Sequence, residues 1–457
     1  MAEGGGLLNR YRGNTPIVGS NPIPSATLPS LLVARRRSRM INVLGRAAAV
    51  LLALGLVLWA SRGRAAEASA EAARQHLYAG TIVAGIAELQ QRVAADGGDR
   101  EARFGLGALQ FVRAVEHLGQ GFYHYGLRSP RTISAPLLRL PVPTNPNPEP
   151  IGYEDFRAQL QSFTDDLAAA DARLADVGDG EVRLVLDLMR VRLDMRGDGK
   201  PSDDETLGQI LSAVSGGMAG PSQAAQSLEV KFDAGDAAWL RGYTHMLMAL
   251  DEFLLAHDFR VTFETTFHLF FPRSRSLLAD ALAAPAPPDS TFGTGEATRI
   301  ADAVALIHTI NWPIIDAARE TKVRAHLLQV VALSRRSWTL IEAETGDDRE
   351  WIPNPRQKSS ALGLTVSEEE LRSWFELLNE AQAILEGRKL IPHWRFRRGF
   401  DVKKFLDEQQ SFDLVMLLSG AGAVPFLADG DVTSSKRWGE MTGAFAGGFL
   451  LHVVWFN

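Results

Sequence analysis

The stretch AAWLRGYTHMLMALDEFLLAH at residues 237–257 decides the fold class. Its apolar residues recur with the 3.6-residue period of an α-helix, and alternating runs that would predict strands are scarce along the chain. The same period predicts helices at 83–95, 101–119, 154–175, 181–194, 204–215, 297–311, 314–343, 367–386 and 412–424. We therefore predict an all-α fold in which helical hairpins pack around an extended core.

The composition excludes several classes of protein. Hydrophobic residues make up 46% of the 457 residues and charged residues 22%, which is typical of a chain that folds. The chain has no cysteine, so disulfide frameworks, thiolate zinc sites and cysteine nucleophiles are excluded. Residues 71–457 hold 39 basic and 52 acidic residues, a net charge of −13, without basic–aromatic repeats. We therefore expect no nucleic-acid partner.

The N-terminal residues have the features of an export signal. The uncharged apolar run 47–60 has 14 residues, fewer than the ~20 of a membrane span, and fits the apolar region of a signal peptide. The small-residue pattern A-x-A follows at 66–68 and again at 68–70, so cleavage would leave Ser69 or Glu71 as the first residue. We predict a periplasmic or secreted protein, with a retained N-terminal membrane anchor as the alternative.

Residues 1–70 are accordingly predicted to be a disordered leader and export signal, starting from Met1 or from Met40. Membrane contact is expected only through this segment, if it stays uncleaved. Proline and glycine divide the rest into a helical-repeat-like segment at 71–129, a proline-rich linker at 130–150, and helical domains at 150–283 and 296–457. The first of these segments is too small for a core of its own and is predicted to pack on the second domain.

One stretch near the N-terminus suggests a repeat. The sequence AGIAELQQRVAADGGDREARFGLG at 84–107 places small and large apolar residues at Ala84, Leu89, Val93, Ala102, Phe104, Leu106 and Gly107. It resembles the junction between two tetratricopeptide repeats, and this resemblance implies helix packing or the binding of a protein partner. No second copy is found, so an ordinary antiparallel helix pair is the alternative.

Residues 194–205, DMRGDGKPSDDE, concentrate oxygen-bearing side chains around two glycines. The stretch resembles the twelve-residue calcium loop of the EF-hand family, which gathers six to eight oxygens around the ion. The resemblance implies calcium ligands from Asp194, Asp198, the Lys200 carbonyl, Ser202 and Glu205. It also implies flanking helices at 182–193 and 206–214.

Two residues depart from the EF-hand pattern. Arg196 stands where another oxygen ligand is expected, and Pro201 lacks the N–H that paired loops use. Any calcium site here is therefore expected to be weak, with a dissociation constant of about 10⁻⁴–10⁻³ M. The alternative is a turn at Asp198 followed by a capping box from Ser202 to Glu205.

The segment 245–268 concentrates histidines and carboxylates. His257, Glu264 and His268 follow one another at intervals of seven and four residues, so on one continuous helix they would share a face. Imidazole and carboxylate groups are ligands of transition metals. This spacing predicts a transition-metal site, and the alternative is a set of polar residues bonded to neighbouring helices.

Other chemical motifs are few. The chain has no glycine-rich phosphate loop with its lysine and no G-x-S-x-G elbow. The basic–aromatic cluster HWRFRR at 393–398 could hold an anionic ligand or a lipid headgroup through its arginines. The alternative is that the cluster neutralises nearby acidic helices.

Scaffolding or partner binding is the function that these features predict. We expect an exported helical protein with a protein partner and a weak structural calcium site, and we assign no catalytic residues. A metal-dependent enzyme that uses the His/Glu cluster around 245–268 is the alternative. A third and weaker hypothesis is a small-ligand binder in an aromatic groove of the C-terminal segment.

Overall fold

The computed structural model describes residues 63–128, 137–214, 227–279, 281, 294–445, 453, 455 and 456. All of them belong to residues 62–457, the second of two compact units into which the chain divides. The predicted apolar segment 47–60 lies outside the described residues. The described part is predominantly helical, so the predicted all-α class is confirmed.

The helices are named in chain order. Residues 63–79 are helical and are followed by α2 (Ile82–Ala95), α3 (Arg100–His124), α4 (Tyr153–Ala175), α5 (Leu207–Val214), α6 (Ala234–Ala256), α7 (Arg260–Thr266), α9 (Thr294–Thr309), α10 (Ala317–Ala343), α11 (Glu368–Leu385), α12 (Val402–Glu408), α13 (Leu414–Ser419) and α14 (Ser435–Gly443). Short 3₁₀ turns occur at Leu137–Arg139, Leu188–Arg190, Phe267–Leu269 and Val424–Phe426. None of the described helices is long and apolar enough to cross a membrane.

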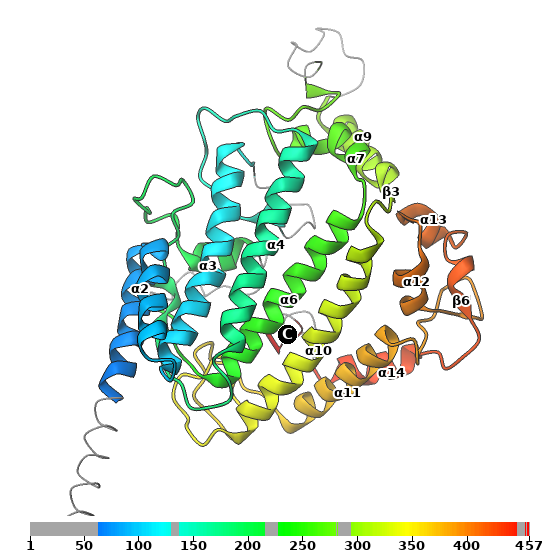
Figure 1. The fold of residues 1–457 in the computed structure, drawn as a ribbon. Helices are drawn as coiled ribbons and strands as arrows, with labels where there is room; N and C mark the ends of the chain where they lie inside the picture. Colours follow the sequence, from blue (N-terminus) through cyan, green and yellow to red (C-terminus); the bar gives the residue numbers. More distant parts are fainter. Residues whose placement is uncertain are drawn as a thin grey trace, which may run out of the picture. The chain divides into compact units, whose positions relative to one another are not determined.

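Five of these helices form a row, in the order α2, α3, α4, α6 and α10 (Figure 1). The most extensive packing is between α6 and α10, followed by that of α3 on α4 and of α4 on α6. Acidic or hydroxyl side chains define several helix starts: Asp99 accepts the N–H of Ala102 in α3, and Asp316 accepts that of Ala318 in α10. Each such cap stabilises its helix by about 1 kcal/mol because it satisfies an otherwise unpaired N–H group.

The helix predicted at 181–194 is wrong. Here β1 (Leu184–Asp187) pairs antiparallel with β2 (Glu229–Phe232), with Leu184 opposite Phe232. Val182, Leu184 and Leu186 are buried and alternate with exposed or half-buried residues, which is the two-residue period of a strand. A run this apolar fits both the 3.6-residue period of a helix and the two-residue period of a strand. It forms a strand here because it pairs with β2, about 45 residues away.

Two further antiparallel pairs are shorter. β3 (Asn311–Pro313) pairs with β5 (Ser411–Asp413), and β4 (Gly399–Phe400) pairs with β6 (Leu427–Ala428). The predicted helix at 412–424 is therefore only partly helical, because its first residues extend β5 and Gly420 ends α13 in the left-handed conformation.

Two large apolar cores lie in the described part. The first joins helix 63–79, α2, α3, α4, β1, α6 and α7, so segment 71–129 shares one core with the residues that follow it. The second joins α10, α11, α14 and residues near the C-terminus, including Trp338, Trp374 and Phe456. Trp351 and Leu362 pack against both cores and connect them.

One carboxyl group lies inside the α4–α6 packing. The side chain of Asp251 is fully buried, and Thr164 Oγ1 donates to its Oδ2 at 3.0 Å. Its Oδ1 has no hydrogen-bond partner among the described residues. Burial raises the pKa of Asp251 from 3.8 to about 8, so the carboxyl group is protonated in the folded protein at neutral pH.

This protonation makes stability pH-dependent. Between the unfolded pKa of 3.8 and the folded pKa of about 8, the folded state binds a proton that the unfolded state has lost. The free energy of unfolding should therefore fall as the pH rises through this window, by up to about 1.4 kcal/mol per pH unit. Asp251→Asn should reduce that fall, measured by urea unfolding at about pH 5 and about pH 8. An unchanged pH slope in the variant would show that Asp251 is ionised in the fold.

Candidate functional site

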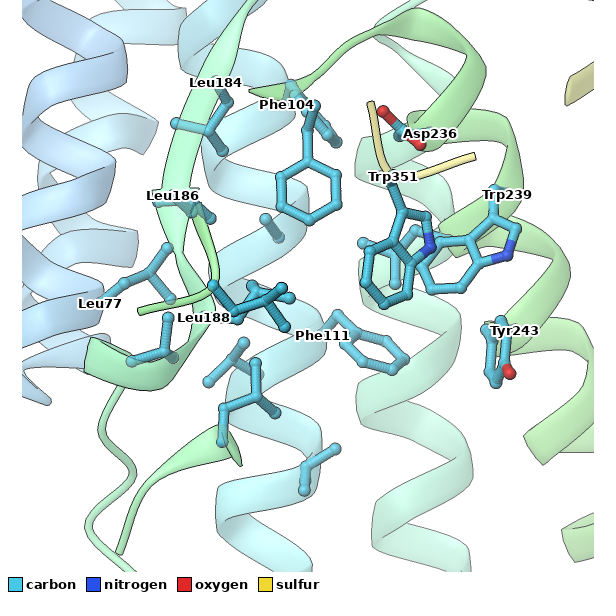
Figure 2. Close-up of a pocket in the computed structure, with 18 of the residues that line it drawn as sticks. Leu77, Phe104, Phe111, Leu184, Leu186, Leu188, Asp236, Trp239, Tyr243 and Trp351 are labelled. Carbon is cyan, nitrogen blue, oxygen red and sulfur yellow. The ribbon is translucent and has the colours of Figure 1, made fainter. Parts of the chain in front are cut away.

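An apolar cavity of about 440 Å³ lies between α3, the β1–β2 pair, α6 and the loop 351–364 (Figure 2). Its lining includes Phe104, Ala108, Phe111, Val112 and Val115 from α3, Leu184 and Leu186 from β1, Phe232 from β2, and Asp236, Trp239, Leu240 and Tyr243 from α6. Trp351, Leu362, Leu364 and Trp455 also line it. This volume falls within the roughly 300–1,000 Å³ typical of small-molecule sites.

Local periodicity places these side chains. Phe104, Ala108, Phe111 and Val115 are three or four residues apart, so they lie along one face of α3. Leu184 and Leu186 are two residues apart and share one face of β1. The lining thus combines a helix face with a strand face from segments about 70 residues apart, and this combination is invisible in either segment alone.

Few polar atoms reach the cavity wall. Trp239 Nε1 donates to the Trp455 carbonyl oxygen at 2.8 Å, and Trp455 Nε1 donates to the Trp351 carbonyl oxygen at 3.0 Å. Trp351 Nε1 is buried and has no hydrogen-bond partner among the described residues. Asp236 and Tyr243 supply the only carboxyl and hydroxyl groups of the lining that the structure describes.

Asp236 belongs to an acidic group at one end of the cavity. Its Oδ2 accepts the backbone N–H of Asp233 at 2.9 Å, as the third residue of a capping box at the start of α6. Burial, reinforced by the charge of Asp233, raises the pKa of Asp236 well above its usual value. Burial together with Asp233 also raises the pKa of Glu344 to about 9.

Glu350 completes this acidic group, which also contains Asp233, Asp236 and Glu344. Oxygens of Asp233, Glu344 and Glu350 lie within 4.8 Å of one another, and among the described residues they are the one set of three that could surround a metal ion. Lys231 Nζ lies 3.3 Å from Glu350 Oε1. Among the described residues, this is the one cation paired with any of the three carboxyl groups.

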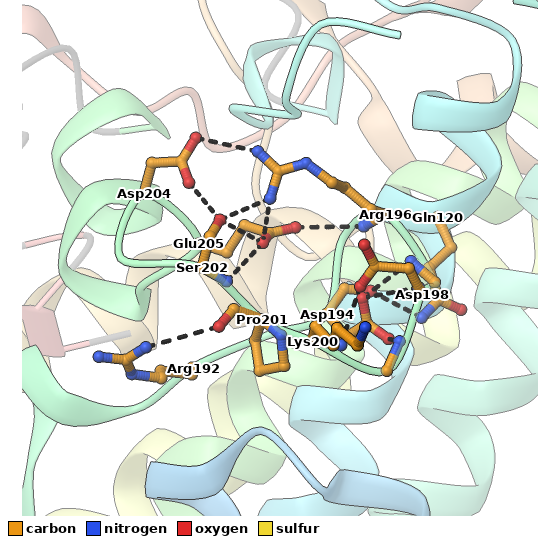
Figure 3. Close-up of polar contacts among 12 residues, drawn as sticks. Gln120, Arg192, Asp194, Arg196, Asp198, Lys200, Pro201, Ser202, Asp204 and Glu205 are labelled. Carbon is orange, nitrogen blue, oxygen red and sulfur yellow. Dashed lines mark hydrogen bonds and ion pairs between the residues drawn. The ribbon is translucent and has the colours of Figure 1, made fainter.

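The predicted calcium loop has an internal cation (Figure 3). Arg196 Nη1 lies 2.6 Å from Glu205 Oε2 and also donates to Ser202. Asp194 accepts backbone N–H groups from residues 197, 198 and 199 at 2.8–3.2 Å. Its carboxylate and that of Glu205 are therefore satisfied by donors of the protein itself. Calcium binding stays a prediction, but this geometry places a guanidinium group among the expected ligands.

The surroundings of this loop also differ from an EF-hand. The incoming helix predicted at 182–193 is wrong, because β1 and a 3₁₀ turn precede the loop. The expected helical capping box is absent as well: Ser202 N–H donates to Glu205 Oε2 at 2.7 Å, but α5 begins only at Leu207. Gly197 and Gly199 have φ values of +70° and +74°, which explains why glycine is used in this turn.

Replacement of Arg196 tests its role as the internal cation. Glu205 is almost fully buried, so Arg196→Asn should lower the free energy of unfolding by about 1–3 kcal/mol. Millimolar calcium should restore part of that loss in the variant, because asparagine supplies an oxygen, and should raise the wild-type melting temperature less, because the Arg196 guanidinium group lies among the expected ligands.

Arg192→Asn is the matched control, since Arg192 pairs with the exposed Asp203 outside the ligand positions. Its melting temperature should respond to calcium as the wild type does. A calcium-induced increase in the wild type as large as that in Arg196→Asn would contradict this assignment.

The predicted metal ligands His257, Glu264 and His268 do not share a helix face. α6 ends at Ala256 and α7 begins at Arg260, so the continuous helix is wrong. His257 Nδ1 lies 2.7 Å from the Phe253 carbonyl oxygen and 3.4 Å from Glu320 Oε1. The nearest acidic partner of His268 is Asp302, at 3.9 Å. Within the described ranges the three residues do not form a metal-binding set.

A distant side chain explains why α6 ends there. Arg157 of α4 donates to the carbonyl oxygens of Leu255 and His257, both at 2.8 Å. These are carbonyl groups that a helix end leaves without partners. The predicted helix end at residue 257 is thus correct to within one residue, and Arg157, 100 residues away in sequence, satisfies the carbonyl groups there.

The other sequence features have structural contacts. In the tetratricopeptide-like stretch, Leu89 is buried and Val93 is half-buried, whereas Ala84 is exposed and Gly85 is the small residue in the packed position. In the basic–aromatic cluster, Trp394 Nε1 donates to the Leu418 carbonyl oxygen at 2.9 Å, and Arg395 donates to that of Ser419. This cluster therefore caps the end of α13.

Comparison with protein-family models, curated proteins and solved structures finds no match for this chain. Its function is therefore inferred from its own residues. The cavity was missed in the sequence because its lining comes from separate segments. The signal that could have indicated it is the spacing of Asp236, Trp239 and Tyr243, which puts one carboxyl and two aromatic groups on one face of α6.

Proposed function

We propose that this protein is a non-catalytic binding protein that holds an apolar small molecule in the cavity between α3, β1 and α6. The observation that carries this proposal is the lining, which is apolar or aromatic except for Asp236. Ligand sites of soluble proteins are typically of this kind, with an apolar wall and a few fixed polar groups.

The energetics of the cavity support a ligand. Protein interiors contain few voids larger than a water molecule, and an unfilled apolar cavity destabilises the fold by an amount on the order of several kcal/mol. Water fills such a space poorly because each molecule needs two to four polar partners. An apolar ligand supplies the missing contacts, and its release from water is favourable.

The two ionisable groups of the lining support binding over catalysis. Burial raises the pKa of Asp236 and that of Tyr243, because it disfavours the ionised form of each group. A general base must instead be unprotonated near the working pH. We therefore propose that these groups orient a ligand by hydrogen bonding or charge.

Filling the cavity tests the proposal. Ala108 lies on α3 between Phe104 and Phe111, so Ala108→Phe should place a ring in the ligand space. Wild-type protein should bind one equivalent of the neutral dye diphenylhexatriene, detected by its fluorescence and displaced by decanol. Ala108→Phe should bind it at least about tenfold more weakly, a loss of about 1.4 kcal/mol.

Ala84→Phe is the matched control, because Ala84 is exposed on α2 and the substitution is the same. Val115→Phe provides a second cavity variant if Ala108→Phe unfolds. Absence of dye binding to the wild type, or equal binding by folded cavity variants and the control, would refute the proposed function.

Export stays a prediction, and one contact favours one of the two cleavage sites. Ser69 is buried, and its hydroxyl donates to Asp99 Oδ2 at 2.7 Å. Cleavage after Ala68 keeps this bond, whereas cleavage after Ala70 removes it. We propose an exported protein whose first residue is Ser69, which N-terminal sequencing of secreted or periplasmic material would establish. Recovery of a chain that still contains 47–60 would contradict cleavage.

A further inference from the structure

One wall of the cavity carries three aromatic rings beside a carboxyl group. Asp236, Trp239 and Tyr243 follow one another at intervals of three and four residues and lie on one face of α6. The ring centroids of Trp239 and Tyr243 are 4.7 Å apart, and those of Trp239 and Trp351 are 5.5 Å apart. Figure 2 shows these four residues together, across the cavity from Leu184 and Leu186.

The charge at this end is unbalanced. Asp236 is 5% exposed and lines the cavity, while Asp233, Glu344 and Glu350 lie close enough to act on its ionisation. Among the residues that the structure describes, Lys231 pairs with Glu350, and no lysine, arginine or histidine pairs with Asp233, Asp236 or Glu344. A cation in the cavity would therefore meet a carboxyl group without a positive partner.

We propose that the ligand of this cavity is an amphiphilic amine, whose ammonium group lies at Asp236 beside Trp351 and Trp239, with Tyr243 further along the same wall. Its apolar body would occupy the remaining space against α3 and β1. This inference rests on the proposed function and names the chemical class of the ligand.

Each part of the wall favours an organic cation. The faces of indole and phenol rings carry negative potential and attract ammonium groups, and several rings around one cation form a recognised binding arrangement. The carboxyl group at Asp236 adds direct charge pairing in a low-dielectric site.

Other ligand classes fit this end less well. A carboxylate or phosphate would meet no lysine, arginine or histidine in the described lining, so its charge would be buried at this end without a cationic partner. A metal ion could be surrounded by Asp233, Glu344 and Glu350, but the aromatic wall beside Asp236 offers it one phenolic oxygen. A neutral chain fits the apolar walls but leaves the carboxyl group uncompensated.

A matched set of ligands tests the inference. Decyltrimethylammonium, decanol and decanoate have the same chain and differ in charge, and all are used below their micelle concentrations. Each should be measured by displacement of diphenylhexatriene from the full wild-type protein. The ammonium compound should bind about tenfold more tightly than decanol, and decanoate should bind most weakly.

Asp236→Asn removes the charge and keeps an oxygen for the Asp233 N–H group. It should abolish the preference for the ammonium compound over decanol. Asp155→Asn is the matched control, because Asp155 has the same capping-box position in α4 and accepts the N–H of Gly152 at 2.8 Å. Trp351→Leu should weaken ammonium binding more than decanol binding, which also shows that the variant is folded.

The outcomes separate the two proposals. If decanol and the ammonium compound bind equally, or if Asp236→Asn leaves their ratio unchanged, the amine inference is overturned and the apolar binding function stands. If neither compound binds, both proposals fall. Competition by calcium against decyltrimethylammonium in the wild type, lost in Glu344→Gln, would assign this end to a metal ion and overturn the inference.

Discussion

The packing of α6 between α4 and α10 is the constraint on which the rest of the structure depends. Asp236, Trp239, Leu240 and Tyr243 of α6 line the cavity, and other residues along the same helix pack on α4 and α10. The same helix thus forms one wall of an apolar site and the centre of a polar interface. Any rotation or shift of α6 would move both together, because a helix in a close-packed interior moves as a unit.

Buried charges determine how α6 lies against its neighbours. Glu252 is buried and lies 2.6 Å from Arg319 and 3.1 Å from Lys322, both on α10. On the other side, Arg241 lies 2.8 Å from Asp171 of α4. Such pairs add little net stability, since desolvation offsets attraction. They still select one register, because a shift of one turn would leave Glu252 buried without a cation.

The parts of this fold that sequence predicted are those that local periodicity controls. The helices α2, α3, α4, α6, α10 and α11 lie within a few residues of the predicted ranges. The errors arise where a distant residue decides the local structure. β2 makes 184–187 a strand by pairing with it from about 45 residues away. In the calcium-like loop the deciding residue was visible, since Arg196 was recognised as a departure, but its pairing with Glu205 required the folded geometry.

The candidate site was less predictable for a physical reason. The size and position of a cavity depend on all the side chains that surround it. Here they come from α3, β1, β2, α6 and the loop 351–364. The carboxyl groups at the polar end of the cavity also come from distant parts of the sequence. Asp236 lies at the start of α6, whereas Glu344 and Glu350 follow α10. The packing of α6 on α10 is what brings these carboxyl groups together.

Function and stability are therefore opposed at this end of the molecule. Burying Asp236 and Glu344 raises their pKa values, because burial disfavours the ionised form of each carboxyl group. The cores on either side, joined through Trp351, hold these groups in place in spite of that cost. A bound ammonium group would stabilise the ionised carboxyl of Asp236 and displace its proton. The same burial that destabilises the free protein is what makes an organic cation bind selectively there, because water no longer screens the attraction.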